Sequence, residues 1–268
     1  MWNITHPFTN TAKRKMQAGQ KTVGAWCQIC SPYTAEIMAR EGFDFLAIDL
    51  EHAPTDIAIL LELVRAMDGT GVQPFVRAPW NDFVAIKKIL DTGVSGVIVP
   101  YVNTREEAEM AVQACKYPPQ GIRGMSGSPR AAGYGRQAME YLKRANAEIM
   151  VITQVETATA VENLDAILAV DDLDGVFIGP MDLATSMGYF GDASQAPVQE
   201  AIAVVEQKVL AAGKVLGSIA ATWDQAKAKY DKGYQMLMVM ADGTAVANAA
   251  ADNVARFRAA YPETTEAL

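Results

Sequence analysis

Residues 43–52 read F-D-F-L-A-I-D-L-E-H, and this stretch decides the fold. Its first six residues form a nearly continuous apolar run, which is typical of a parallel strand buried on both faces. Asp49, Glu51 and His52 follow where that strand meets its loop. In α/β folds this end of a strand carries the chemistry. His52 therefore has two interpretations, a proton-transfer group or a residue that caps a loop.

The same unit, an apolar run followed by an amphipathic stretch, recurs along the chain. Predicted strands cover residues 23–28, 43–49, 73–77, 96–100, 149–155, 175–178, 215–219 and 236–240. Predicted helices follow at residues 34–40, 56–67, 82–91, 105–116, 158–169, 198–212, 223–232 and 244–260. Eight alternating pairs predict the α/β class and a single closed (β/α)8 TIM barrel rather than a doubly wound sheet. We expect a polar leader at residues 1–20 and one barrel domain at residues 21–268.

The composition of the chain indicates which kinds of binding partner and which cellular compartment to expect. The formal net charge is -8 and the pI is near 4.9, so nucleic acid and anionic membranes are not expected partners. No apolar stretch reaches the length of a membrane span and residues 1–11 lack the apolar core of a signal peptide, so a cytoplasmic protein is expected. Cys27 and Cys30 form a C-x-x-C, but on a strand they point to opposite faces and are interpreted as structural.

One connection is longer than a helix-to-strand turn requires. Residues 117–137 read Y-P-P-Q-G-I-R-G-M-S-G-S-P-R-A-A-G-Y-G-R-Q, and a short helix is predicted after them at residues 138–147. If that helix leads back along the outside of the barrel to the strands' amino ends, the loop before it must first reach the face that carries the strands' carboxyl ends. A lid or a subunit contact is then its expected role.

Polar residues gather at the predicted strand ends. They are Trp26 and Gln28 on the first strand, Asp49, Glu51 and His52 on the second, Arg77 on the third, Gln154 and Glu156 on the fifth and Asp182 on the sixth. The active site of a barrel is built at this face, so these side chains are expected to converge.

Glu156 and Asp182 follow adjacent strands and could share one divalent cation. Two carboxylates favour magnesium, manganese or cobalt over zinc. The alternative is that Glu156 only caps the following helix and Asp182 only caps its own. Arg77 needs an anionic partner because it closes a strand suited to burial, and that partner is either a substrate oxygen or a structural carboxylate, Asp49 or Glu51.

Six ordered motifs carry a resemblance to a known family. They are G-A-W from Gly24, F-D-F-L-A-I-D-L-E-H-A-P from Phe43, V-R-A-P-W-N-D from Val76, Y-P-P-Q-G-I-R-G from Tyr117, Q-V-E-T from Gln154 and D-G-V-F-I-G-P-M-D-L from Asp174. Together they resemble the HpcH/HpaI family of metal-dependent pyruvate aldolases, which includes the 4-hydroxy-2-oxoheptanedioate aldolases. The resemblance spans residues 24–241.

The resemblance implies a role for each matching position. Glu156 and Asp182 would bind the divalent metal, Mg²⁺, Mn²⁺ or Co²⁺, and the backbone amides of Met181 and Asp182 would hold the substrate carboxylate. Arg77 would stabilise the enolate oxygen. His52 would act as general acid and base, assisted by Asp49 and Asp91. Expected substrate contacts are Trp26, Gln154, Arg123 and Leu216.

The implied reaction is the reversible cleavage of a 4-hydroxy-2-oxo acid into pyruvate, or hydroxypyruvate, and an aldehyde, through an enolate held by the metal and Arg77. Three alternatives stay open: a Schiff-base aldolase, an acyl-CoA thioester lyase of the citrate lyase type, and a barrel that only binds a 2-oxo acid. The family resemblance also implies a homo-oligomer, a hexamer built from dimers that exchange the C-terminal helix.

Overall fold

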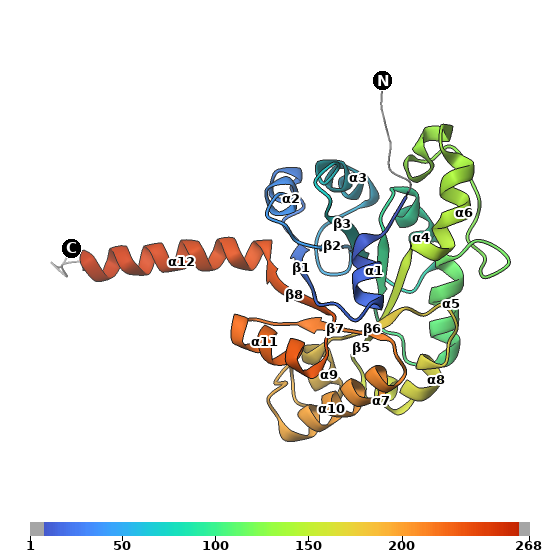
Figure 1. Ribbon diagram of the computed structural model, residues 1–268. Coiled ribbons are helices and arrows are strands. Elements are labelled where there is room, and N and C mark those ends of the chain that lie inside the picture. Colours follow the sequence, from blue (N-terminus) through green and yellow to red (C-terminus); the bar gives the residue numbers. More distant parts are fainter. Residues whose placement is uncertain (1–7, 263–268) are drawn as a thin grey trace.

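The computed structural model describes residues 8–262, and its centre is a closed barrel of parallel strands (Figure 1). The strands are β1 (Thr22–Cys27), β2 (Phe45–Asp49), β3 (Gln73–Arg77), β4 (Gly96–Val99), β5 (Met150–Val155), β6 (Gly175–Ile178), β7 (Val215–Ile219) and β8 (Met236–Ala241). Each strand pairs with the next, and β8 pairs with β1 to close the barrel. The predicted fold, a single (β/α)8 barrel, is confirmed.

Helices follow the strands, and all but the last of those listed lie around the outside of the barrel between one strand and the next. They are α2 (Pro32–Ala39), α3 (Ile57–Ala66), α4 (Phe83–Asp91), α5 (Arg105–Cys115), α6 (Ala138–Glu148), α7 (Ala158–Glu162), α8 (Leu164–Leu168), α9 (Pro180–Ser186), α10 (Ala196–Ala211), α11 (Trp223–Lys232) and α12 (Asp242–Ala260). The single helix predicted at residues 158–169 is two helices. Asn163 separates them, and its side-chain amide donates to the Asn103 carbonyl across the loop after β4.

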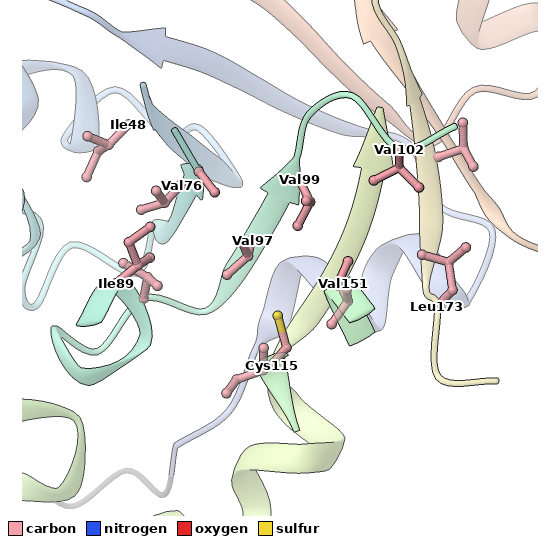
Figure 2. Close-up of a cluster of buried hydrophobic side chains, with 14 of the residues drawn as sticks. Ile48, Val76, Ile89, Val97, Val99, Val102, Cys115, Val151 and Leu173 are labelled. Atoms are coloured by element: carbon pink, nitrogen blue, oxygen red, sulfur yellow. The ribbon is translucent and has the colours of Figure 1, made fainter. Parts of the chain in front are cut away.

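Buried side chains form two layers because each strand is apolar on both faces. The outer layer lies between strands and helices, as Figure 2 shows for Ile48, Val76 and Val97 beside Ile89 of α4 and Cys115 of α5. The inner layer fills the barrel, with Phe45, Phe75, Ile98, Met150, Ile152, Phe177, Val215, Met236 and Met238 among its members. The barrel is therefore a packed core, and a site can form only at its ends.

Glycines make room for the aromatic rings of the inner layer. Gly24 of β1 is the register partner of Phe45 on β2, and a Cβ at Gly24 would lie 2.2 Å from the Phe45 ring. The same pairing of phenylalanine and glycine recurs between Phe75 and Gly96. Large and small residues thus alternate between neighbouring strands, as close packing of a barrel interior requires.

The predicted polar leader is wrong for its described part. Residues Thr11–Gln17 form helix α1, and Ala12 and Met16 join the inner layer of the barrel. Asn10 is fully buried, where its side chain caps α1 and donates to the Ser95 carbonyl. Residues 10–17 therefore close the face that carries the strands' amino ends. The polar residues of this segment suggested a surface position, because the groups that accept their hydrogen bonds lie far away in the sequence.

The long connection also differs from the prediction. Its 3-10 turn, η1 (Arg130–Gly135), is anchored by Arg130, which donates to the Asp68 carboxylate after α3 and to the Thr92 carbonyl after α4. Both partners lie near the strands' amino ends. The expectation that the loop reaches the face with the strands' carboxyl ends is therefore wrong for the part held by Arg130.

Helix α12 leaves the barrel directly after β8 and extends away from it (Figure 1). From Val246 to its end, every residue of α12 is exposed, including Val254 and Phe257. Among residues 8–262, no helix combines the length and the apolar character needed to cross a membrane.

Candidate active site

Asp49 and Arg77 form a two-pronged ion pair at the barrel mouth, the face where the strands' carboxyl ends meet. They end β2 and β3 and are register partners. Arg77 Nε donates to Asp49 Oδ1 at 2.9 Å, and Nη2 donates to Oδ2 at 2.6 Å. Burial acts to raise the pKa of Asp49, but the Arg77 bonds and charge outweigh it and the pKa lies below its ordinary value. Asp49 is therefore a charged anchor for Arg77.

Asp49 also fixes the loop that carries His52. Its Oδ1 accepts from the backbone N–H groups of Glu51, at 3.0 Å, and His52, at 3.2 Å. Gln28 donates to Oδ2 at 2.9 Å. The His52 ring itself is largely exposed, and its Nε2 lies 3.6 Å from Glu51 Oε2. Asp49 thus positions the backbone of His52, whereas the carboxylate nearest the ring is Glu51.

Trp26 of β1 lies against the guanidinium group. The Arg77 Cζ atom is 4.4 Å from the centre of the Trp26 ring, and Phe177 packs edge-on against the same ring. A cation over an indole face is stabilised by the electrons of the ring. Trp26, Asp49 and Arg77 therefore form one rigid group that presents the arginine at the mouth.

Glu156 and Asp182 converge beside Gly179. Glu156 follows β5 and is 2% exposed, while Asp182 lies in the first turn of α9, after the neighbouring strand β6. A Cβ at Gly179 would lie 2.9 Å from Glu156 Oε2 and 3.8 Å from Asp182 Oδ2. The absence of a side chain at Gly179 keeps open the space that both carboxylates border.

The remaining bonds of Glu156 hold it in place. Its Oε1 accepts from the backbone N–H of Tyr101 at 2.7 Å, and its Oε2 accepts from the side-chain amide of Gln154. The other amide atom, Gln154 Oε1, is buried without a hydrogen-bond partner. Gln154 therefore supports Glu156 and offers one free acceptor.

Negative charge accumulates at this part of the mouth. Burial raises the pKa of Glu156 to about 7, and the charges of Glu51 and Asp182 add to the effect. Burial also raises the pKa of Glu51, although Arg77 opposes the shift. Glu51 Oε2 lies 3.2 Å from Arg77 Nε but has no hydrogen-bond partner, since Arg77 bonds Asp49. Three carboxylates thus share one region with a cation that is already paired.

This charge distribution fits a divalent cation. Glu156 and Asp182 are hard oxygen donors at one opening, the glycine between them leaves space, and a cation would relieve the cost of burying Glu156 in its charged form. Among residues 8–262, no group of three or more His, Cys, Asp or Glu side chains is arranged as a complete metal site. The pair would therefore supply two ligands and leave positions for water and a chelating substrate.

Two predicted site residues lie at the other end of the barrel. Asp91 ends α4, and Arg123 donates to it at 3.0 Å. Arg123 is 1% exposed, between Tyr117 and Tyr141, so its predicted contact with substrate is wrong. Within one chain Asp91 is separated from His52 by the length of the strands, about 15 Å. The Asp91–Arg123 pair instead ties the long loop to the end of α4.

Leu216 is also misplaced by the prediction. It belongs to the outer layer between β7 and the helices, whereas its neighbour Val215 faces the barrel interior. A contact between Leu216 and substrate is therefore wrong. Met181, in contrast, lies in the first turn of α9 at the mouth and is 61% exposed.

Two further residues lie at the mouth, Trp80 and Tyr101, and neither was predicted as a site residue. Tyr101 follows β4 by two residues and Trp80 follows β3 by three, so the rule that selected the other strand ends also applies to them. Tyr101 adopts the left-handed backbone conformation, with φ 53°, which is uncommon for a residue other than glycine. Its N–H reaches Glu156 in this conformation.

This chain is similar to known proteins over most of its length. The family model described as HpcH/HpaI aldolase/citrate lyase matches residues 22–249. A hydroxypyruvate/pyruvate aldolase of Cupriavidus necator is 41% identical over 94% of this chain and 94% of its own. A 4-hydroxy-2-oxo-heptane-1,7-dioate aldolase of Klebsiella pneumoniae is 40% identical over 97% of this chain and 98% of its own.

A solved structure extends the comparison to three dimensions. The crystal structure of an HpcH/HpaI aldolase/citrate lyase family protein from Burkholderia cenocepacia superposes with a TM-score of 0.89 and 33% identity, over 93% of this chain and 100% of the other. Sequence and fold thus agree over nearly the whole length, and the chain belongs to the HpcH/HpaI aldolase/citrate lyase family.

Proposed function

We propose that this protein is a divalent-metal-dependent aldolase that reversibly cleaves 4-hydroxy-2-oxo acids into pyruvate, or hydroxypyruvate, and an aldehyde. One observation carries the proposal: the Arg77–Asp49 pair opens onto the same mouth as the Glu156 and Asp182 carboxylates. The names of the relatives in Cupriavidus and Klebsiella support it.

Glu156 and Asp182 are proposed to hold Mg²⁺, Mn²⁺ or Co²⁺. When bound, such a cation lowers the energy of the enolate by offsetting its negative charge. The N–H groups of Met181 and Asp182, in the first turn of α9, are proposed to hold the substrate carboxylate, since the first amides of a helix lack intrahelical partners.

Arg77 and His52 are proposed to handle the charge and the proton. His52, directly or through a water molecule, takes the proton of the C4 hydroxyl group, and the C3–C4 bond breaks as the aldehyde carbonyl forms. The electron pair of that bond enters the enolate of pyruvate, whose oxygen accepts from Arg77. Arg77 uses Nε and Nη2 to bond Asp49, so its Nη1 is the donor proposed for the enolate oxygen. Protonation of C3 then completes pyruvate.

The Schiff-base alternative needs a lysine near the mouth. Within the described residues no strand contains a lysine. Lys214 precedes β7, and its Nζ donates to the Val170 and Leu173 carbonyls near the strands' amino ends. An acyl-CoA thioester lyase would need cations for the phosphates of its substrate, and the arginines of the mouth, Arg77 and Arg105, are both paired with carboxylates.

Metal removal tests the proposed function. Treatment with EDTA should abolish pyruvate release from a 4-hydroxy-2-oxo acid, because two carboxylates without a cation repel the forming enolate. Adding Mn²⁺, Co²⁺ or Mg²⁺ should restore it. The rate is followed by a coupled assay for pyruvate. Full activity in metal-free buffer would contradict the mechanism, and the absence of cleavage under all conditions would favour a barrel that only binds a 2-oxo acid.

We also propose that the chain forms a homo-oligomer through α12, as a hexamer of exchanged dimers. Val246, Val254 and Phe257 are 53–62% exposed on this helix, so an isolated chain leaves apolar surface in water. Sedimentation equilibrium of the full chain should give a mass near six times 28.9 kDa. A monomeric mass at micromolar concentration would exclude this arrangement.

A further inference from the structure

Trp80 and Tyr101 form an exposed aromatic pair on one side of the mouth. Trp80 lies in the loop after β3 and Tyr101 in the loop after β4. Their ring centres are 5.5 Å apart with an angle of 31° between the planes, and the residues are 55% and 41% exposed. Two large rings held together in water at this position offer a surface to a ligand in the mouth.

The backbone of Tyr101 ties this pair to the catalytic carboxylates. The Tyr101 N–H donates to Glu156 Oε1 at 2.7 Å, and its carbonyl accepts from the Asn103 side chain. The Tyr101 backbone is therefore fixed beside one of the two carboxylates proposed to hold the metal.

Positive charge is scarce around this pair. The segments that join strand ends to the following helices, and the segment between α9 and α10, contain no lysine. They contain no arginine either, and the arginines that border them are Arg77, bonded to Asp49, and Arg105, whose Nε donates to Glu109 one turn along α5. A second carboxylate on a substrate would thus find no unpaired lysine or arginine in these described segments or at their borders.

We propose that the Trp80–Tyr101 pair is the wall that receives the aldehyde, and that it makes the enzyme select uncharged aldehydes over aldehydes with a terminal carboxylate. This inference rests on the proposed function and adds the class of acceptor to it. The rings cover the apolar part of an uncharged aldehyde. A carboxylate there would lose water without gaining a free lysine or arginine, and it would lie near Glu51 and a metal whose charge Glu156, Asp182 and the bound 2-oxo acid already offset.

The test compares two acceptors that differ in charge. The reaction runs in the direction of synthesis, with pyruvate, Mn²⁺ and either succinic semialdehyde or its methyl ester, and kcat/KM is measured for each. We expect the ester to be preferred by about tenfold or more, the scale of one unscreened like-charge contact at a protein surface. Equal values for the two acceptors would overturn the inference.

Substitutions at Trp80 separate charge from shape. Trp80→Lys should move the preference toward succinic semialdehyde by about tenfold, while Trp80→Gln should lower kcat/KM for both acceptors and leave their ratio unchanged. The matched control is Trp223→Lys, since Trp223 is 68% exposed and opens α11 after β7, on the opposite side of the barrel. If Trp223→Lys or Trp80→Gln shifts the ratio as far as Trp80→Lys, the assigned position is wrong.

A separate measurement keeps this inference distinct from the proposed function. Exchange of the pyruvate C3 protons for deuterium, with Mn²⁺ and no aldehyde, reports enolate formation alone. If the C3 protons exchange but the two acceptors react with equal kcat/KM, only the proposed role of the Trp80–Tyr101 pair is overturned. Absence of exchange would overturn the proposed function, and the inference with it.

Discussion

Arg77→Ala should lower kcat/KM for aldol cleavage by about 10²–10³-fold, the scale of losing one donor to an oxyanion. The guanidinium is the donor proposed for the enolate oxygen, and Asp49 and Trp26 hold it in position. Pyruvate release is the measurement for cleavage, and deuterium exchange at C3 reports the enolate step. A loss below tenfold would assign Arg77 a structural role.

The same substitution should also destabilise the fold. Removal of Arg77 leaves the Asp49 carboxylate buried without its cation, which costs about 3–5 kcal/mol for a broken buried pair. Chemical denaturation measures this loss, and activity is then expressed per folded molecule. Arg105→Ala is the matched control, because Arg105 pairs with Glu109 on an exposed helix face and should change stability by less than about 1 kcal/mol.

Glu156→Gln should greatly lower activity and stabilise the metal-free protein. The amide cannot replace a charged ligand, so Mn²⁺ affinity should fall at least about 100-fold. Cleavage should fall about 10³-fold, because several kcal/mol of charge stabilisation are lost. Mn²⁺ binding is measured by titration calorimetry on the purified variant. Wild-type affinity in the variant would remove Glu156 from the metal site.

The gain in stability follows from the pKa of Glu156, which is raised from 4.5 to about 7 in the folded protein. Metal-free wild-type protein should therefore lose up to about 3 kcal/mol as the pH rises from 4.5 through 7, because the folded state disfavours the ionised form. The variant has no such group, so it should exceed the wild type at pH 8 and match it near pH 4.5. Denaturation at both pH values measures this difference.

The matched control for that experiment is Glu41→Gln, on the exposed turn after α2. It removes one negative charge of the same type from the surface and should change stability by less than about 0.5 kcal/mol. A pH dependence that disappears equally in both variants would contradict the assignment to Glu156.

Much of the site could be predicted because its residues follow apolar runs. A parallel strand buried on both faces leaves a strong pattern, and the carboxyl end of such a strand points to the mouth. Asp49, Arg77, Glu156 and Asp182 were found by this rule, and all four lie there. Tyr101 and Trp80 follow the same rule, but their aromatic side chains did not suggest a polar site.

The failures have a common physical origin in contacts between distant segments. Arg123 was expected to contact substrate, yet Asp91, Tyr117 and Tyr141 satisfy its charge inside the protein. Lys13 was assigned to a polar leader, yet its Nζ donates to the Ile149 carbonyl and to Asp174. Residue type alone does not show whether a charged group has found a buried partner.

The sequence by itself determined the barrel, its order of strands and the acids and arginine at their ends, since these depend on local apolar periodicity and on one rule of topology. Only the tertiary structure decided which apolar residues face the barrel interior. A strand buried on both faces has no alternation of apolar and polar residues along its sequence, so Val215, which faces inward, and Leu216, which faces outward, cannot be told apart by residue type. The tertiary structure also decided that Asp49 binds Arg77 while Glu51 lies beside the His52 ring, since side chains from three loops compete there within a few ångströms.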